Sequence, residues 1–347
     1  MQIYKKMRDD IVNSVYKFGE KLPSKRLLSE EANCSVITIE HAYAILCDEG
    51  YVQSRQRSGY FVSYKKNDFI PVTNISPAAV TTQSFADSND DTFPFSVYAK
   101  TMRIVISKYG DKLLSKSPNL GCDELKTAIC NYLARSKGIT VEKNQIIIGS
   151  GAEYLYGLIV QFLGRDKMYG IERPSYDKIL SVYKANGAEC DLLKLGTDGI
   201  LSEELERTNA QVLHITPYRS YPSGVTASAS KRNEYINWAK KRNAIIIEDD
   251  FDSEFTISTK HADTVFSLEP IEHVVYINTF TKTIAPSMRV GYMVLPQKLV
   301  ASFQNKLGFY YCTVPLFEQY LLTELINNGD FERHINRTRR KRRRIIK

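Results

Sequence analysis

Two patterns of apolar positions succeed each other along most of the chain. One is typical of buried strands, and the other is typical of amphipathic helices. Short apolar runs, typical of buried strands, lie at 145–148, 168–172, 212–216, 244–248, 274–277 and 290–295. Amphipathic helical patterns at 123–137, 153–163, 176–186 and 231–242 separate the first four runs. This alternation predicts an α/β fold, a mostly parallel sheet flanked by helices, with ligands at the carboxyl ends of the strands.

The first 64 residues show a different pattern. Apolar residues recur at three- and four-residue steps from Ile3 to Phe18, which predicts a helix that ends at Gly19. Ser24 and Ser35 are suitable N-caps for helices at 25–32 and at 36–49. Two strand-like runs, 51–55 and 60–63, then flank a polar turn. A helix, a helix-turn-helix and a hairpin, in that order, predict a winged helix.

Composition adds few constraints. The fractions of apolar residues, 43%, and of charged residues, 25%, are those of an ordinary globular protein. The six cysteines lack the paired spacing that is typical of metal sites, which predicts reduced thiols and a cytoplasmic location. No apolar run is long enough to predict a membrane span. The net charge of +8 comes from the basic run 337–347, which suggests either a nucleic-acid contact or a solvated helix face.

Lys282 stands out chemically within the stretch 274–295. It is the only charged residue in the polar turn 278–283 between two apolar runs, and Arg289 follows seven residues later. Partial desolvation disfavours a charged ammonium, and a neutral amine can form a Schiff base with an aldehyde. Hydroxyl groups and a guanidinium suit a phosphate. The stretch therefore fits pyridoxal 5′-phosphate (PLP), an aldehyde that carries a phosphate; a surface lysine in a polar loop is the alternative.

The stretch resembles the Schiff-base segment of fold-type-I aminotransferases, most closely that of the MocR-type regulators. Those proteins carry a Ser/Thr-Phe-Ser/Thr-Lys-Thr run followed by Pro-x-x-Arg-x-Gly-Tyr, here 279–283 and 286–292. In the family, such a domain follows a GntR-type winged-helix domain. The first part of this chain resembles that winged-helix domain too, at residues 23–26, 34–38, 46–52 and 57–62. The resemblance implies DNA contacts by the following residues: Lys25, Arg26, Ser35, Thr38, Arg55 and Arg57.

The resemblance also implies a PLP site in which Lys282 forms the Schiff base. The other cofactor-binding residues implied are Gly151, Ala152, Tyr176, Tyr221, Asp249, Thr279, Thr281 and Arg289. Asp249 is expected to pair with the pyridine nitrogen, Tyr176 to stack on the ring, and the turn at Gly151 to hold the phosphate. Adjacent acidic residues at 249 and 250 can also suggest a metal, but no histidine is close in sequence, so we expect no metal site.

We therefore expect a winged helix-turn-helix domain at 1–66, a linker at 67–92 and a fold-type-I aminotransferase-like domain at 93–347. In the family a small C-terminal domain follows, so we expect this large domain to be C-terminally incomplete. The expected function is PLP-dependent transcriptional regulation: a homodimer binds double-stranded operator DNA and senses an amino compound or PLP. A working aminotransferase with an accessory DNA-binding domain is the alternative. Tyr221 and Phe251 count against it, because true aminotransferases usually have an asparagine where Tyr221 stands, and the family has a tyrosine where Phe251 stands.

Overall fold

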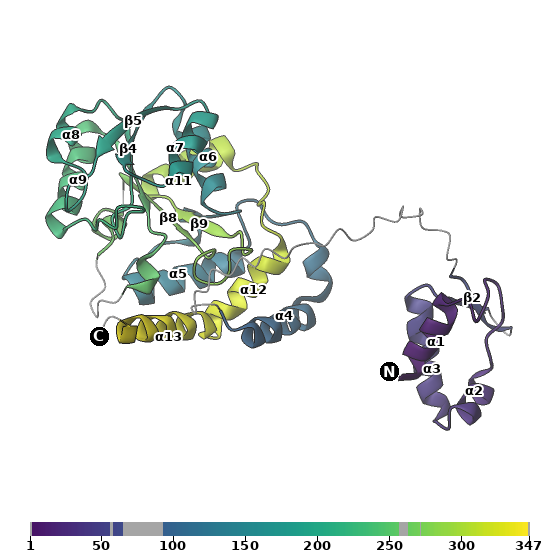
Figure 1. The fold of residues 1–347 in the computed structure, drawn as a ribbon. Coiled ribbons are helices and arrows are strands. Elements are labelled where there is room, and N and C mark those ends of the chain that lie inside the picture. Colours follow the sequence, from purple (N-terminus) through teal and green to yellow (C-terminus); the bar gives the residue numbers. More distant parts are fainter. Residues whose placement is uncertain (1, 56–57, 65–92, 257–262, 271, 346–347) are drawn as a thin grey trace, which may run out of the picture. The chain divides into compact units, whose positions relative to one another are not determined.

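A computed structural model describes residues 2–55, 58–64, 93–256, 263–270 and 272–345. The chain forms two compact units, Met1–Ala86 and Asp87–Lys347, which are described separately (Figure 1). Within the described residues, no helix combines the length and the apolar character that a membrane span requires.

The first unit packs three helices against a two-stranded antiparallel sheet. Its elements are α1 (Gln2–Val12), α2 (Lys25–Glu31), α3 (Val36–Asp48), β1 (Val52–Arg55) and β2 (Gly59–Val62). Ser24 and Ser35 cap α2 and α3, since each side-chain oxygen accepts a hydrogen bond from the backbone N–H three residues on. Tyr43 and Leu46 of α3 are fully buried in the core of this unit. The order of elements is the one that the apolar pattern predicts for a winged helix.

The first helix is shorter than the sequence predicts. It ends at Val12, because Ser14 adopts a left-handed backbone conformation with φ of 63°. Val15 and Phe18, which the predicted helix places on its buried face, are 63% and 58% exposed. The prediction that this helix ends at Gly19 was wrong.

The second unit is built on a seven-stranded sheet with strand order β3-β9-β8-β7-β6-β4-β5. Its strands are β3 (Ile146–Gly149), β4 (Met168–Arg173), β5 (Glu189–Lys194), β6 (Val212–Ile215), β7 (Ile245–Asp249), β8 (Val274–Thr279) and β9 (Gly291–Val294). β9 runs antiparallel to both of its neighbours, and the other pairings are parallel. Six of these strands match predicted runs, whereas the edge strand β5 was not predicted.

Helices cover both faces of this sheet, as Figure 1 shows. They are α4 (Phe95–Tyr109), α5 (Asp123–Lys137), α6 (Ala152–Leu163), α7 (Asp177–Ala185), α8 (Ser202–Arg207), α9 (Ala229–Arg242), α10 (Val265–Leu268), α11 (Val300–Leu307), α12 (Leu316–Asn327) and α13 (Asp330–Ile345). Short 3-10 helices lie at η1 (Gly110–Leu114), η2 (Lys143–Gln145), η3 (Ser253–Phe255) and η4 (Gln297–Leu299). The four predicted helices correspond to α5, α6, α7 and α9.

Strand side chains alternate between two cores, one on each face of the sheet. Ile146 and Ile148 of β3 join the core that contains α5, α9 and α12, whereas Ile147 joins the core of α6, α7 and α11. With both faces covered, the polar residues that follow the parallel strands gather at their carboxyl ends. The predicted α/β fold class is confirmed.

Candidate functional site

A cavity of about 310 Å³ opens at the carboxyl ends of the parallel strands. Its lining comprises Ala152, Glu153, Tyr156, Tyr176, Ile179, Thr216, Tyr221, Asp249, Phe251, Thr279, Thr281, Lys282 and Arg289. The structure thus brings together eight of the nine residues predicted for the cofactor site, and the ninth, Gly151, is the N-cap of α6 beside it. Residues up to 137 positions apart in sequence share this cavity because the strands that flank them belong to one sheet.

One end of the cavity lies at the N-terminus of α6. Gly151 has φ of 92°, and a Cβ at this position would lie 3.2 Å from Nη2 of Arg289, so the glycine allows the guanidinium to approach the backbone. Arg289 forms an ion pair with Glu153, which also accepts a hydrogen bond of 2.9 Å from Lys178. The hydrogen bonds from Lys178 and then from Arg289 hold the pKa of Glu153 below its ordinary value. A helix N-terminus beside a guanidinium is a suitable site for an anion.

Asp249, the last residue of β7, is buried and has one free oxygen. Its Oδ2 accepts a hydrogen bond from the hydroxyl of Tyr156, whereas its buried Oδ1 has no hydrogen-bond partner among the described residues. Burial, and next the charge of Asp249, raise the pKa of Tyr156 well above its ordinary value, so this hydroxyl stays a donor. A buried carboxylate with an unused acceptor can bind a cationic N–H group in the cavity.

A histidine lies next to this carboxylate in space, although none is close to it in sequence. His214 of β6 places Nε2 3.7 Å from Oδ2 of Asp249, and its Nδ1 is 2.6 Å from the hydroxyl of Tyr183. The two residues are far apart in sequence, and they meet because β6 and β7 are adjacent parallel strands. Among the described residues, no three His, Cys, Asp or Glu side chains form a group that could hold a metal ion.

Lys282 lies in the loop after β8 with 40% of its side chain exposed. Its Nζ is 2.6 Å from Oδ1 of Asp252 and 4.7 Å from the ring centroid of Phe251. Asp252 was not predicted to belong to the site. Its place three residues beyond Asp249, after the end of a buried strand, is the signal that sequence analysis missed.

Two tyrosine rings lie at the mouth of the cavity. Tyr176 is the N-cap of α7, and its ring centroid is 6.3 Å from that of Tyr221, with an angle of 73° between the ring planes. The two side chains are 40% and 60% exposed, respectively. Exposed aromatic faces beside a cavity suit the binding of a planar ring.

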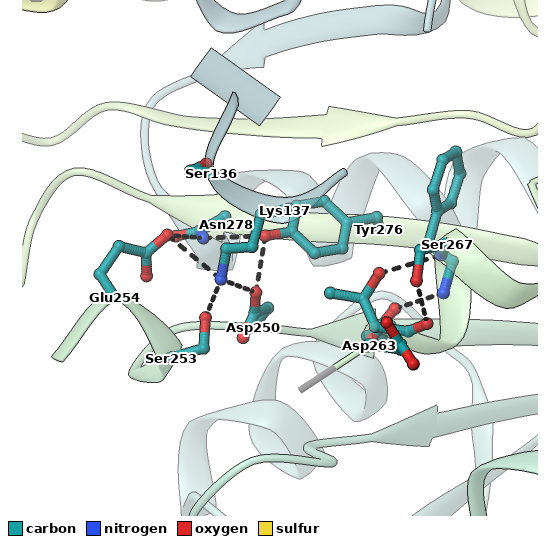
Figure 2. A network of polar contacts seen from close by, with 12 residues as sticks. Ser136, Lys137, Asp250, Ser253, Glu254, Asp263, Ser267, Tyr276 and Asn278 are labelled. Atoms are coloured by element: carbon teal, nitrogen blue, oxygen red, sulfur yellow. Dashed lines mark hydrogen bonds and ion pairs between the residues drawn. The ribbon is translucent and has the colours of Figure 1, made fainter. Parts of the chain in front are cut away.

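A buried polar network joins Lys137 to acidic residues of the segment that follows β7 (Figure 2). Lys137, the last residue of α5, places Nζ 2.8 Å from Oδ2 of Asp250 and 3.7 Å from Oε1 of Glu254. Tyr276 donates to Asp250 at 2.7 Å, and Asn278 donates to Glu254 at 2.8 Å. Acidic residues of one short segment thus point in two directions, some toward the cavity and some into this network.

The residues predicted to contact DNA lie in the first unit. Ser35 and Thr38 are exposed at the N-terminus of α3, with their hydroxyl oxygens 2.8 Å apart. Lys25 forms an ion pair with Glu40, Arg26 is exposed, and the guanidinium of Arg55 lies 4.5 Å from the ring centroid of Phe61. The remaining predicted residue, Arg57, lies outside the described residues. Exposed hydroxyl groups and guanidinium groups around a helix N-terminus suit the phosphates of a nucleic acid.

Two family models together match most of the chain. Residues 1–62 match the bacterial regulatory proteins of the gntR family, and residues 85–347 match aminotransferase class I and II. An uncharacterized HTH-type transcriptional regulator of Bacillus subtilis, YdeL, is 32% identical over 99% of this chain and 77% of its own length. The probable rhizopine catabolism regulatory protein MocR of Rhizobium meliloti is 26% identical over 98% of this chain and 74% of its own.

The second unit is also similar to solved aminotransferase structures. A kynurenine aminotransferase from Pyrococcus horikoshii, solved in complex with PMP, aligns with a TM-score of 0.65 and 25% identity. The alignment covers 72% of this chain and 64% of the aminotransferase. The chain therefore spans about three quarters of the curated relatives and slightly less than two thirds of this enzyme.

Proposed function

The chain belongs to the MocR-type transcriptional regulators, which join a GntR domain to an aminotransferase class I and II domain, and from this we propose how it acts. The first unit binds operator DNA, and the second holds PLP through Lys282 and senses an amino compound or PLP. We place the protein in the cytoplasm as a homodimer, with residues 1–66 as the DNA-binding domain, 67–92 as the linker and 93–347 as the cofactor domain.

The observation that carries the cofactor proposal is the buried Oδ1 of Asp249, a residue that lines the cavity: this oxygen has no hydrogen-bond partner among the residues that the structure describes. PLP supplies an aldehyde that bonds a lysine amine and a pyridinium ring that withdraws electrons. Asp249 would accept a hydrogen bond from the protonated ring nitrogen and keep that nitrogen charged. Tyr176 would cover the ring face, and Tyr221 would contact its edge.

Charge and hydroxyl groups at the other end of the cavity fit the phosphate. Arg289, the hydroxyls of Thr279 and Thr281, and the backbone around Gly151 and Ala152 would hold it. Arg289 is paired with Glu153, so a phosphate would compete with that carboxylate for the guanidinium. The close approach of Arg289 to Gly151 supports this role, because only a residue without a side chain leaves that space open.

The first unit supports DNA binding through α3. Its N-terminal end exposes Ser35 and Thr38, and the recognition helix of such a fold enters the major groove by this end. Val36 and Ile37, 41% and 77% exposed, add apolar surface at the same end. Apolar side chains suit contact with thymine methyl groups. Lys25, Arg26, Arg55 and Arg57 would contact the phosphate backbone.

Absorbance spectroscopy tests the cofactor proposal. The purified wild-type protein is titrated with PLP beside Lys282→Ala and beside Lys178→Ala, which removes a lysine that is also paired with an acidic residue but does not line the cavity. We expect a visible absorbance band for the wild type and for Lys178→Ala that Lys282→Ala lacks. A wild-type spectrum equal to the sum of free protein and free PLP would refute the proposal.

A further inference from the structure

The first turn of α3 presents apolar side chains to solvent. Ile37 is 77% exposed and Val36 is 41% exposed, whereas Ile39, Tyr43 and Leu46 of the same helix are fully buried. Single exposed apolar residues are common on protein surfaces, so it is their position that matters. Val36 and Ile37 are adjacent and lie at the end by which the recognition helix of a winged helix enters the major groove.

The same helix lacks the side chains that most often read guanine. Its sequence, VITIEHAYAILCD, contains neither lysine nor arginine, which bind the O6 and N7 atoms of guanine. The carboxylate of Glu40, one turn after Val36, forms an ion pair with Lys25 of α2. It is therefore engaged rather than free to accept a hydrogen bond from the amino group of cytosine. These features disfavour readout of a G·C pair by the start of α3.

The two hydroxyl groups at this helix end are largely engaged with each other. Oγ of Ser35 lies 2.8 Å from Oγ1 of Thr38 and also accepts a hydrogen bond of 3.2 Å from the backbone N–H of Thr38. One hydroxyl hydrogen of the pair is used between them, and the other remains to donate to a phosphate oxygen. The methyl groups of Val36 and Ile37 are therefore the main groups that α3 offers to base edges at this end.

We propose that Ile37 and Val36 read thymine through its C5 methyl group, so that the operator carries thymine where the start of α3 enters the major groove. The thymine methyl is the apolar group that base pairs display in that groove, and contact with an alkyl side chain removes both from water. The inference rests on the proposed DNA-binding function. It adds the base that is read and the two residues that read it.

Uracil substitution tests the inference, because uracil is thymine without the methyl group and pairs with adenine in the same way. The full-length wild-type protein first enriches a duplex from a random pool. Each thymine of the enriched site is then replaced singly by uracil, and affinity is measured by fluorescence anisotropy at one salt concentration. The same duplexes are measured with Ile37→Ala, Val36→Ala and Val15→Ala. Val15, 63% exposed and outside α3, is the matched control for loss of an exposed apolar side chain.

We expect the wild type and Val15→Ala to bind about fourfold more weakly when uracil replaces a contacted thymine, as the burial of one methyl group implies. Two such replacements should weaken binding about fifteenfold, since independent contacts add in free energy. Ile37→Ala should bind the thymine and uracil duplexes equally at the position that Ile37 contacts, and Val36→Ala should do so at its own position. An effect of uracil on DNA shape would persist in both variants. Circular dichroism melting checks that each variant is folded.

Four results would overturn the inference, and they are distinct. An enriched site without thymine, or equal wild-type affinity for thymine and uracil at every position, removes the methyl contact while DNA binding itself stands. Uracil effects that Ile37→Ala and Val36→Ala leave unchanged assign the methyl group to another residue. If these two variants also have a lower mass in light scattering, their apolar side chains belong to a protein interface. Failure to enrich any duplex contradicts the proposed DNA-binding function, and the inference fails with it.

Discussion

Among the described residues, Lys137 is the cation that forms ion pairs with both Asp250 and Glu254 in the buried network of Figure 2, and replacing it by methionine removes that charge. Methionine has a similar length and fits an apolar environment, so the change removes the charge with little change in volume. Lys137, Asp250 and Glu254 are 5%, 3% and 3% exposed at their side chains. Two carboxylates would then remain buried next to each other without a counter-ion.

The size of the effect follows from this burial. Removing one partner of a buried ion pair costs about 3–5 kcal/mol, because the remaining charge is desolvated without compensation. Lys143 of the same unit provides a matched control. Its Nζ is also 2.8 Å from an aspartate oxygen, that of Asp123, but the two side chains are 51% and 70% exposed. Lys143→Met should therefore cost only about 0–1 kcal/mol.

The single tryptophan makes this measurement specific to the second unit. Trp238 of α9 is 7% exposed and donates to the carbonyl oxygen of Leu205 at 2.8 Å, so its fluorescence reports the unfolding of this unit alone. Urea unfolding of the wild type and both variants gives the difference in free energy of unfolding. A loss below about 1 kcal/mol for Lys137→Met, or one equal to that of Lys143→Met, would refute the reasoning.

Three further predictions concern pH, the cavity and DNA. Burial raises the pKa of Glu172 from 4.5 to about 8, so the folded protein retains a proton that the unfolded chain releases, and the stability that this group contributes is lost as the pH rises through this range. Glu172→Gln should flatten the decrease in melting temperature between pH 5 and pH 9, and an unchanged profile would contradict this assignment. Gly151→Ala should weaken PLP binding at least tenfold in a spectroscopic titration, because its Cβ would crowd Arg289; Gly224→Ala, with φ of 73° and no atom within 4 Å of the added Cβ, should not. Arg26→Gln should weaken DNA binding to all sequences alike and lower the slope of log affinity against log salt by about one in fluorescence anisotropy, whereas a change in sequence preference would indicate base contact.

The regular elements were predictable where burial was strong. The apolar runs at 212–216 and 244–248 correctly predicted β6 and β7. Strands that are covered on both faces of a sheet are apolar along their whole length, so such runs are a clear signal. β5, Glu189–Lys194, was missed because Leu193 is the one buried residue of this edge strand, so its sequence lacks an apolar run. The end of α1 was missed because Val15 and Phe18 continue the apolar period although the backbone turns at Ser14.

The site was predictable as a set of residues but not as a set of contacts. Lys282, Asp249 and Arg289 were identified from motifs, and the topology explains why they meet, since each follows or flanks a strand of one sheet. The partners His214 and Asp252 were not identified, because each lies across a turn or on a neighbouring strand. Such pairings depend on register and side-chain direction, which the spacing of residues along the chain does not encode.

The central claim is that the cofactor site in the second unit regulates DNA binding by the first. The most direct test measures DNA affinity by fluorescence anisotropy, with and without PLP, for the wild type and Lys282→Ala. The probe is a duplex that the wild-type protein has enriched from a random pool. The account predicts that PLP changes the affinity of the wild type and leaves that of Lys282→Ala unchanged. Failure to enrich any duplex, the same affinity with and without PLP in the wild type, or the same PLP effect in both proteins would contradict it.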